Sequence, residues 1–183
     1  EDLEQSPDTY RTLEATGKGL KGLRYRIQVS PLDCTGCNNC VDICPAKTTA
    51  LEMKPLDEAL ALEEANFRFA NTLPEPELKI STTTVRGSQF CRPLFEYSGA
   101  CAGCGETPYL KLITQLFGER MLIANATGCS SIYGSNHPTS PYAVNSKGRG
   151  PAWASSLFED NAEYGYGFYL GVLQQREKLI EYV

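Results

Sequence analysis

Hydrophobic residues in the C-terminal half of the chain alternate between helix-like and strand-like periods. After Thr107-Pro108 they recur every three or four positions, at Tyr109, Leu112, Ile113, Leu116 and Phe117. This period predicts an amphipathic helix that begins at Thr107 and ends at Gly118. The continuous apolar run over residues 121–124 then predicts a strand that is covered on both faces.

A long polar segment rich in glycine and proline follows, over residues 127–154. It is far longer than an ordinary connection, as functional or disordered loops often are. Ser156 and Glu159 have capping-box spacing, and a final helix is predicted over residues 160–180. The small residues early in this helix suit close packing, because glycine otherwise destabilises a helix.

The N-terminal half has a weaker pattern. A short helix is predicted over residues 8–15, and the alternation of apolar and polar residues over 24–29 predicts a strand. A return strand is predicted over residues 50–53 and a helix over 58–69. From Pro55 to Leu94 the proline, threonine and glycine content indicates an extended connector, with a domain boundary near residue 55.

Four cysteines in this half have a highly specific spacing. Cys34, Cys37, Cys40 and Cys44 are separated by two, two and three residues, and Pro45 follows directly. In bacterial ferredoxins this spacing lets three thiolates hold one 4Fe-4S cluster while the fourth holds another. A structural zinc site is the alternative, but zinc sites normally use two separated ligand pairs. The spacing therefore predicts an iron-sulfur site and electron transfer.

Composition narrows the class of protein. The 183 residues carry a formal net charge of -5, and no stretch mixes basic with aromatic residues, which argues against nucleic-acid binding. The eight cysteines cluster too closely for a disulfide scaffold, so we expect a reducing compartment. Without an apolar run of membrane-spanning length or a signal-peptide pattern, we expect a soluble, cytoplasmic protein. The first residue is not methionine, and we expect a piece of a longer chain.

A second group of cysteines lies in the C-terminal half. Cys101 and Cys104 precede the helix that begins at Thr107, and Cys129 follows the predicted strand. Because ligands of open α/β sheets bind at the carboxyl ends of strands, the three thiolates are expected to converge. A redox dithiol or half a zinc site are alternatives for the pair. Glu106 is either a carboxylate favoured by the helix dipole or a functional group.

Two further reactive side chains have simpler interpretations. His137 is the only histidine and lies in a loop sequence without a carboxylate at useful spacing, so we expect a surface or packing role. Cys91 stands alone, and we expect an incidental or buried thiol because free cysteine packs as a small hydrophobic residue.

Four stretches together identify a resemblance to a known family. They are SGACAGCGETPY over residues 98–109, LFGER over 116–120, ANATGCSS over 124–131 and GPAW over 150–153. With the ferredoxin-type cysteine spacing, these stretches closely resemble pyruvate:ferredoxin (flavodoxin) oxidoreductase, and the resemblance covers nearly the whole chain.

The resemblance implies a long, multidomain and usually homodimeric parent enzyme. Members of the family oxidatively decarboxylate pyruvate on thiamine diphosphate with Mg²⁺, deliver the acetyl group to coenzyme A, and pass electrons through three 4Fe-4S clusters to ferredoxin or flavodoxin. The implied fold is α+β and α/β. Residues 1–54 are then the second half of a two-cluster ferredoxin-like domain, 55–94 an extended linker, and 95–183 the N-terminal part of a thiamine-diphosphate-binding domain.

The resemblance also implies which cysteines of the ferredoxin-like part bind clusters. Cys34, Cys37 and Cys40 are expected to hold one 4Fe-4S cluster, while Cys44 reaches across to the other. The first cysteine run of a two-cluster domain is missing from this sequence. A stand-alone electron-transfer module therefore remains a second hypothesis, and a zinc-binding structural module a third.

The resemblance likewise implies which residues of the thiamine-binding part form its cluster site and its thiamine site. Cys101, Cys104 and Cys129 are expected to hold the cluster nearest the thiamine, and Glu106 and Cys129 to line the thiamine site. The fourth cluster ligand, the magnesium-diphosphate motif, and the domains that bind pyruvate and coenzyme A are absent from the sequence. We therefore expect the chain alone to be inactive.

Overall fold

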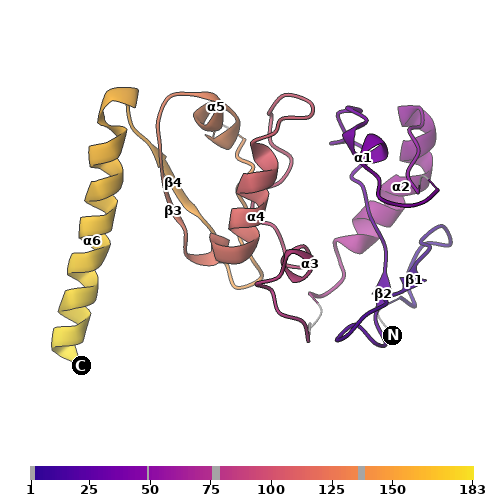
Figure 1. Cartoon of the computed structure of the whole chain (residues 1–183), viewed down its shortest axis with the longest axis horizontal. Helices are drawn as coiled ribbons and strands as arrows, with labels where there is room; N and C mark the ends of the chain where they lie inside the picture. Colours follow the sequence, from indigo (N-terminus) through magenta and orange to yellow (C-terminus); the bar gives the residue numbers. More distant parts are fainter. Residues whose placement is uncertain (1–2, 49, 76–78, 136–138) are drawn as a thin grey trace. The chain divides into compact units, whose positions relative to one another are not determined.

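The computed structural model of the chain describes residues 3–48, 50–75, 79–135 and 139–183. The chain divides into two compact units, an N-terminal unit of residues 1–81 and a C-terminal unit of residues 82–183 (Figure 1). Compact units need not coincide with domains, and the domain limits at residues 54 and 94 stay predictions. No helix in the described ranges is long and apolar enough to cross a membrane.

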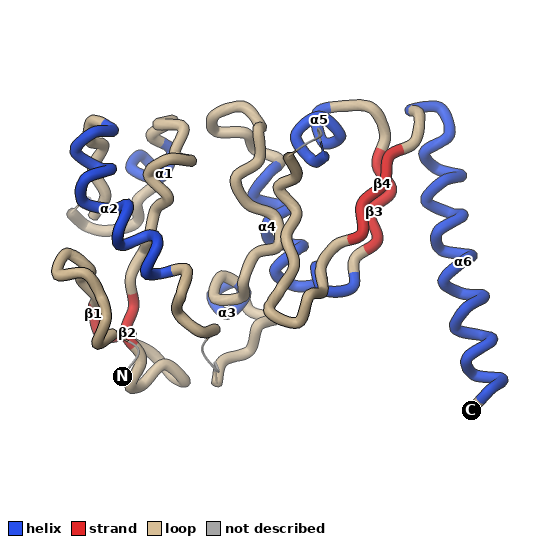
Figure 2. Tube along the Cα trace, turned by 180° about the vertical axis from the view of Figure 1, so that it is seen from behind, coloured by secondary structure: helices blue, strands red, loops and turns tan. Residues whose placement is uncertain are grey.

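The N-terminal unit contains little regular structure. Its elements are β1 (Leu13–Glu14), β2 (Arg24–Tyr25), α1 (Asn39–Asp42) and α2 (Leu56–Ala70) (Figure 2). The two strands pair antiparallel, with Leu13 opposite Tyr25. The hairpin between them turns through glycines at positive φ, among them Gly19 and Gly22, a conformation that side chains other than glycine rarely adopt.

The prediction of a helix over residues 8–15 is wrong. These residues form a turn and then β1, which pairs with β2. The Arg24 side chain reinforces the pairing, because its Nε donates to the Thr12 hydroxyl at 3.0 Å and its Nη2 to the Thr12 carbonyl at 2.7 Å. A segment this short has few helical hydrogen bonds to lose, so the strand contacts prevail.

Three further predictions for this unit have different outcomes. The helix over residues 58–69 is confirmed as α2, which begins one residue after Pro55. The return strand over residues 50–53 is wrong, since the described residues there are in no strand. The strand predicted over 24–29 is reduced to Arg24–Tyr25, because β1 offers a partner for two residues only.

The C-terminal unit has a strand-and-helix architecture. In chain order its elements are α3 (Val85–Ser88), α4 (Thr107–Phe117), η1 (Gly118–Arg120), β3 (Leu122–Asn125), α5 (Cys129–Ser135), β4 (Ala152–Ser155), η2 (Phe158–Asp160) and α6 (Asn161–Tyr182). Strands β3 and β4 pair in parallel, from Leu122 opposite Ala152 to Asn125 opposite Ser155. Helix α6 lies along β3 (Figure 1), where a Cβ at Gly165 would be 3.5 Å from Ala124 Cβ.

The sequence predicted most of these elements. The helix from Thr107, the strand near residues 121–124 and the final helix are confirmed as α4, β3 and α6. The segment 127–154 is not one loop, however, because it contains α5 and the start of β4. Coverage of β3 on both faces is wrong at Leu122, whose side chain is 52% exposed. The predicted capping box does not form, since η2 intervenes and the Ser156 hydroxyl donates to the Leu157 carbonyl at 3.0 Å.

A small core in this unit forms around two neighbouring residues. Leu94 and Phe95 are fully buried, and the Leu94 amide donates to the Thr114 hydroxyl of α4 at 3.2 Å. The Phe95 ring packs edge-on against Tyr133 of α5, with a centroid distance of 6.0 Å, and against Tyr142 at 5.0 Å. The core thus joins α4, α5 and the segment that leads to β4.

Candidate functional site

The first cysteine group lies on a tightly turned loop of the N-terminal unit. Gly36 and Asn38 both have left-handed backbone conformations, with φ of 68° and 66°. The Cys34 amide donates to the Ser30 carbonyl at 3.2 Å, and the Asn38 side chain donates to Asp42 at 2.7 Å. The spacing of two residues between cysteines is accommodated because these left-handed positions let the chain curl.

Three of the four thiols of this loop are exposed, and none of the four is in a disulfide bond. Cys34, Cys37 and Cys40 are exposed, Cys44 is half-buried, and all four are free cysteines. Backbone N–H groups of Ala50 and Ala46 face the Cys44 sulfur and lower the pKa of its thiol. Thiolate is the form that binds metals, so these N–H groups favour the ligand state of Cys44.

The donor set fits an iron-sulfur cluster in kind. Soft thiolates are the ligands that iron-sulfur chemistry selects, and backbone N–H groups around sulfur are among the features that tune such clusters. Within the described ranges, no three Cys, His, Asp or Glu side chains are gathered closely enough to hold a metal ion. The loop therefore supplies the ligands and their spacing without a closed metal-binding geometry.

The second cysteine group begins in a turn just before α4. The Cys104 amide donates to the Cys101 carbonyl at 3.0 Å, and Gly103 takes a φ of 70° within this turn. The Thr107 hydroxyl, on the first residue of α4, donates to the Cys104 carbonyl at 3.4 Å. Both cysteines thus stand next to the N-terminus of an 11-residue helix, where the helix dipole favours negative charge.

Glu106 occupies the N-cap position of α4, but its side chain makes no capping hydrogen bond. It lies instead near Tyr133 and Tyr142. Burial raises the pKa of Tyr133 well above its ordinary value, and the nearby Glu106 carboxylate raises it further. Burial and the same carboxylate also raise the pKa of Tyr142. The carboxylate therefore lies near two tyrosines and does not cap the helix, although Glu106 as a residue is exposed.

Cys129 is placed where the sequence predicted, just beyond the carboxyl end of a parallel strand. It is the first residue of α5 and is exposed. The connection from β3 is held by the Asn125 side-chain oxygen, which accepts from the Ala126 amide and the Ser130 hydroxyl, both at 2.9 Å. This pair of hydrogen bonds sets the direction in which α5 leaves the strand.

Tyr133 is in the helix that begins at Cys129, and it lies close to Cys104 and Glu106. Residues four apart on a helix share a face, so Cys129 and Tyr133 lie on one side of α5. Tyr133 in turn lies close enough to Cys104 and Glu106 for their charges to raise its pKa. Cys104 and Glu106 thus lie near Tyr133, but no three ligand side chains are gathered among the described residues, and the convergence of Cys101, Cys104 and Cys129 stays a prediction.

Tyr133 was not found by reading the sequence. The Tyr133 hydroxyl and the Trp153 indole Nε1 are buried, and neither has a partner at normal hydrogen-bond geometry among the described groups. Tyr133 stands four residues after Cys129, a helical spacing that becomes informative only once α5 is known. Of the simpler predictions, Cys91 is a half-buried thiol, and His137 lies outside the described residues.

A shallow pocket of about 300 Å³ opens at the first turn of α4, beside Thr107 and Pro108. It is lined by Phe95, Glu96, Tyr97, Ser98, Thr107, Pro108 and Lys111. The Lys111 ammonium lies 3.3 Å from the Glu96 carboxylate. The start of α4 thus carries a carboxylate, two thiols and an open concave surface within a few residues.

Comparison with known proteins supports the cysteine assignment in the N-terminal unit. Residues 27–48 match the family described as the 4Fe-4S binding domain. The match includes Cys34, Cys37, Cys40 and Cys44 and ends before α2. It identifies the class of cofactor for this loop and does not extend to the second cysteine group.

Curated relatives match nearly the whole chain. A pyruvate:ferredoxin oxidoreductase from Moorella thermoacetica is 63% identical over 178 residues, which are 97% of this chain and 15% of the relative. A pyruvate-flavodoxin oxidoreductase from Trichormus variabilis is 50% identical over 184 residues, covering 97% of this chain and 16% of the relative. A pyruvate dehydrogenase [NADP(+)] from Cryptosporidium parvum is 52% identical over 183 residues, covering 100% and 9%.

The extent of these matches confirms the resemblance seen in the motifs. They run through both units and include both cysteine groups. The chain spans about a sixth or less of the length of these relatives. Over nearly its whole length, the chain therefore corresponds to one segment of the pyruvate:ferredoxin and pyruvate-flavodoxin oxidoreductases.

Proposed function

We propose that the chain is part of an enzyme that oxidatively decarboxylates pyruvate to acetyl-CoA and CO₂ and passes the electrons to ferredoxin or flavodoxin. The observation that carries this proposal is the 50–63% identity to such oxidoreductases along nearly the whole chain. The 4Fe-4S match over residues 27–48 adds independent support for electron transfer. The complete enzyme is cytoplasmic and homodimeric in this proposal, and the chain alone is inactive.

In this proposal the N-terminal loop holds iron-sulfur clusters. Cys34, Cys37 and Cys40 bind one cluster, and Cys44 binds a second one. A 4Fe-4S cluster supplies one-electron redox chemistry when bound. The chain's own part is to present the thiols at this spacing and, at Cys44, to favour the thiolate through the backbone N–H groups of Ala50 and Ala46.

In this proposal the second cysteine group binds a cluster next to the catalytic site. Cys101, Cys104 and Cys129 bind a third cluster, and its fourth ligand comes from outside this sequence. Cys129 also lines the thiamine site. The turn before α4 and the end of β3 supply the three thiols from elements that are already hydrogen-bonded in place. The dipole of α4 accommodates part of the negative charge that such a group carries.

Glu106 is the proposed catalytic residue and contacts thiamine diphosphate. Thiamine diphosphate, bound with Mg²⁺, supplies the means to stabilise the carbanion left when pyruvate loses CO₂. The Glu106 carboxylate holds or moves a proton at its Oε atoms, a role for which a side chain free of capping hydrogen bonds is available. Tyr133 and Tyr142 lie close to this carboxylate, while Glu106 itself is exposed and accessible to a ligand.

The proposal is tested by comparing the complete enzyme with the isolated chain. Under anaerobic conditions, the complete enzyme should reduce a viologen dye in a reaction that depends on both pyruvate and coenzyme A. The isolated chain should show none of this activity, because the remaining substrate and diphosphate groups are not in it. A complete enzyme that fails to use any 2-oxoacid would contradict the proposed reaction. An active isolated chain would contradict the proposal that the reaction needs the rest of the enzyme.

A second candidate function is supported by the 4Fe-4S match alone, which covers residues 27–48 without the rest of the chain. It is a stand-alone electron-transfer module that performs no chemistry on substrates. A zinc-binding structural module is the remaining alternative for the same thiols. Metal and sulfide analysis of anaerobically purified protein separates the last two, because only an iron-sulfur protein contains iron and acid-labile sulfide in similar amounts.

A further inference from the structure

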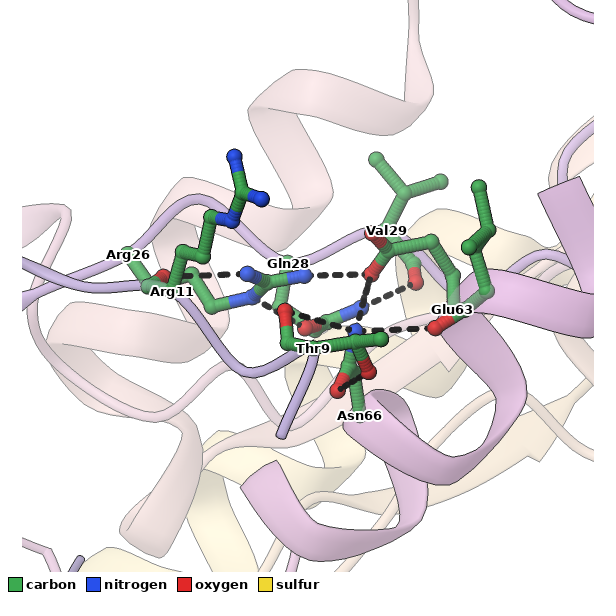
Figure 3. Close-up of polar contacts among 8 residues, drawn as sticks. Thr9, Arg11, Arg26, Gln28, Val29, Glu63 and Asn66 are labelled. Carbon is green, nitrogen blue, oxygen red and sulfur yellow. Dashed lines mark hydrogen bonds and ion pairs between the residues drawn. The ribbon is translucent and has the colours of Figure 1, made fainter. Parts of the chain in front are cut away.

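Helix α2 is tied to the segment that enters the cysteine loop by a polar network in the N-terminal unit. Figure 3 shows this Asn66 network, whose members come from the start of the chain, from the segment around β2 and from α2. Its side chains are those of Thr9, Arg26, Gln28, Glu63 and Asn66. The helix thus contacts two segments that are distant from it in the sequence.

Asn66 lies at the centre of the network and is completely buried. Its Nδ2 donates to the Leu62 carbonyl at 2.9 Å and to Glu63 Oε2 at 3.4 Å. Its Oδ1 accepts from the Thr9 hydroxyl at 2.9 Å. A buried amide with both polar atoms used is costly to replace, because an apolar substitute leaves buried partners unsatisfied.

Glu63 extends the network to the segment that directly follows β2. Its Oε2 accepts from the Arg26 guanidinium and, at 2.9 Å, from Gln28 Nε2. Burial alone would raise the pKa of Glu63, but the hydrogen bonds from Gln28, Arg26 and Asn66 and the charge of Arg26 lower it overall. Arg26 also donates to the Arg11 carbonyl at 3.0 Å. Glu63 therefore joins α2 to the segment after β2, and Arg26 and Asn66 join both to the start of the chain.

Hydrogen bonds continue from this network to the first cysteine. Gln28 Nε2 also donates to the Val29 carbonyl at 3.0 Å, and the next residue, Ser30, is buried. The Ser30 hydroxyl donates to Asp33, and the Ser30 carbonyl accepts from the Cys34 amide. Hydrogen bonds at Gln28 and at Ser30, two residues apart in the chain, thus connect Cys34 to α2.

Apolar packing offers little alternative anchorage in this unit. Among its described residues, Leu20 and Pro31 are the only fully buried apolar side chains. Small units without a sufficient core usually depend on a metal or a cross-link for stability. The Asn66 network is therefore the main buried contact that orients the loop apart from any bound cluster.

We propose that Glu63 and Asn66 are positioning residues for the iron-sulfur cluster bound by Cys34, Cys37 and Cys40. The inference rests on the proposed function, because it requires a cluster in this loop. The two residues act through the segment of residues 26–34 and touch neither the cluster nor its ligands. Their removal loosens the first ligand and admits water to the cluster.

The test uses the complete enzyme, purified anaerobically, with Glu63→Gln and Asn66→Asp compared against Glu64→Gln. Glu64 is the matched control, since it is adjacent on α2 but pairs with Arg68 at the surface. We expect iron to be lost to a chelator faster in both network variants, up to about 10-fold, the lower end of what outer-shell partners contribute to metal affinity. Glu64→Gln should behave like the unmodified enzyme.

A second measurement separates positioning from general destabilisation. Water near a cluster stabilises its more highly charged reduced state, so the midpoint potential of the clusters that remain in Glu63→Gln should rise. The signal of the cluster bound by Cys101, Cys104 and Cys129 should not change. If both network variants lost iron at the rate of the unmodified enzyme and kept its midpoint potential, the inference would be overturned while the proposed function stood. The same would follow if Glu64→Gln showed changes as large as theirs. A Cys37→Ser enzyme with full iron and sulfide content would overturn the inference together with the proposed cluster site.

Discussion

The two units of the chain hold their cysteines in different ways. In the N-terminal unit the thiols stand on an irregular loop, and the buried contacts around them are mainly polar, with Asn66 completely enclosed. In the C-terminal unit Cys104 precedes α4 and Cys129 begins α5, and these regular elements pack around a core that includes Phe95 and Tyr133. A ligand loop can thus be oriented by hydrogen bonds where apolar burial is scarce, and by strand and helix ends where a core exists.

The largest effect is expected from substituting one cysteine of each group, which tests whether the two units hold separate clusters. In the complete enzyme, Cys40→Ser should remove a cluster of the ferredoxin-like region, and Cys101→Ser the cluster at the thiamine site, because serine oxygen is a poor ligand for sulfide-bridged iron. Each change should cost about four irons. Low-temperature magnetic resonance with iron counting measures the losses. Two variants that lose the same signal would contradict the assignment of two separate groups.

Glu106→Gln should have the next largest effect. The change keeps the shape of the side chain but removes the charge needed for proton transfer, and such steps contribute about 10²- to 10⁴-fold in rate. We expect turnover of pyruvate by the complete enzyme to fall by about that factor while the cluster content stays intact. Steady-state kinetics and iron analysis on the same preparation check both parts.

A thermal melt controls for the structural interpretation of Glu106. If the carboxylate only interacted with the dipole of α4, its loss would cost about 0.3 to 1 kcal/mol of stability. Near-normal turnover together with a slightly lower melting temperature would show that Glu106 is a helix-end carboxylate without a catalytic role.

Leu94→Ala should affect the stability of the C-terminal unit alone. The side chain is 3% exposed, and it fills the space beside Gly118, where even a Cβ would come within 3.0 Å of it. Buried leucine-to-alanine changes cost about 2 to 5 kcal/mol. Hydrogen exchange should become faster in peptides of residues 82–183, whereas peptides of residues 1–75 should be unchanged. Leu157→Ala, at a side chain that is 67% exposed, is the control and should alter neither.

The smallest expected effect is an opposite response of the two units to pH. The pKa of Glu63 is lower in the folded unit than its ordinary value of about 4.3, so its contribution to stability is present above that value and lost as the pH falls through the folded pKa. The pKa of Tyr133 is raised, so its contribution is present below about pH 10 and lost as the pH rises further.

The hydrogen bond from Arg149 also lowers the pKa of Glu119 in the C-terminal unit, but at an exposed ion pair. Burial also raises the pKa of Tyr10 in the N-terminal unit, which the charge of Arg26 partly offsets. Acid should therefore loosen the N-terminal unit first, and alkali the C-terminal unit. Hydrogen exchange corrected for the intrinsic pH dependence, or limited proteolysis at both extremes, measures this directly. Glu63→Gln should remove the acid response and Tyr133→Phe the alkaline one. The prediction would be wrong if both units opened together at either extreme.

Element prediction succeeded where the local pattern was long and periodic. Helices α2, α4 and α6 follow from their apolar spacing and end signals, and β3 follows from its apolar run. The failures are short segments. Residues 8–15 became a turn and a strand because β2 was available as a partner, and α5 was missed because seven residues carry too little periodicity.

The sequence by itself determined the class of chemistry. The spacing of Cys34 to Cys44 and the motif around Glu106 identify iron-sulfur ligation and the oxidoreductase relatives, since ligand spacing within a short loop is a local property. Only the tertiary structure decided which distant residues support those motifs. Asn66 lies 32 positions beyond Cys34, and Tyr133 lies 27 beyond Glu106. Their roles arise from burial and long-range hydrogen bonds, which depend on how helices and strands pack and leave no periodic mark in the sequence.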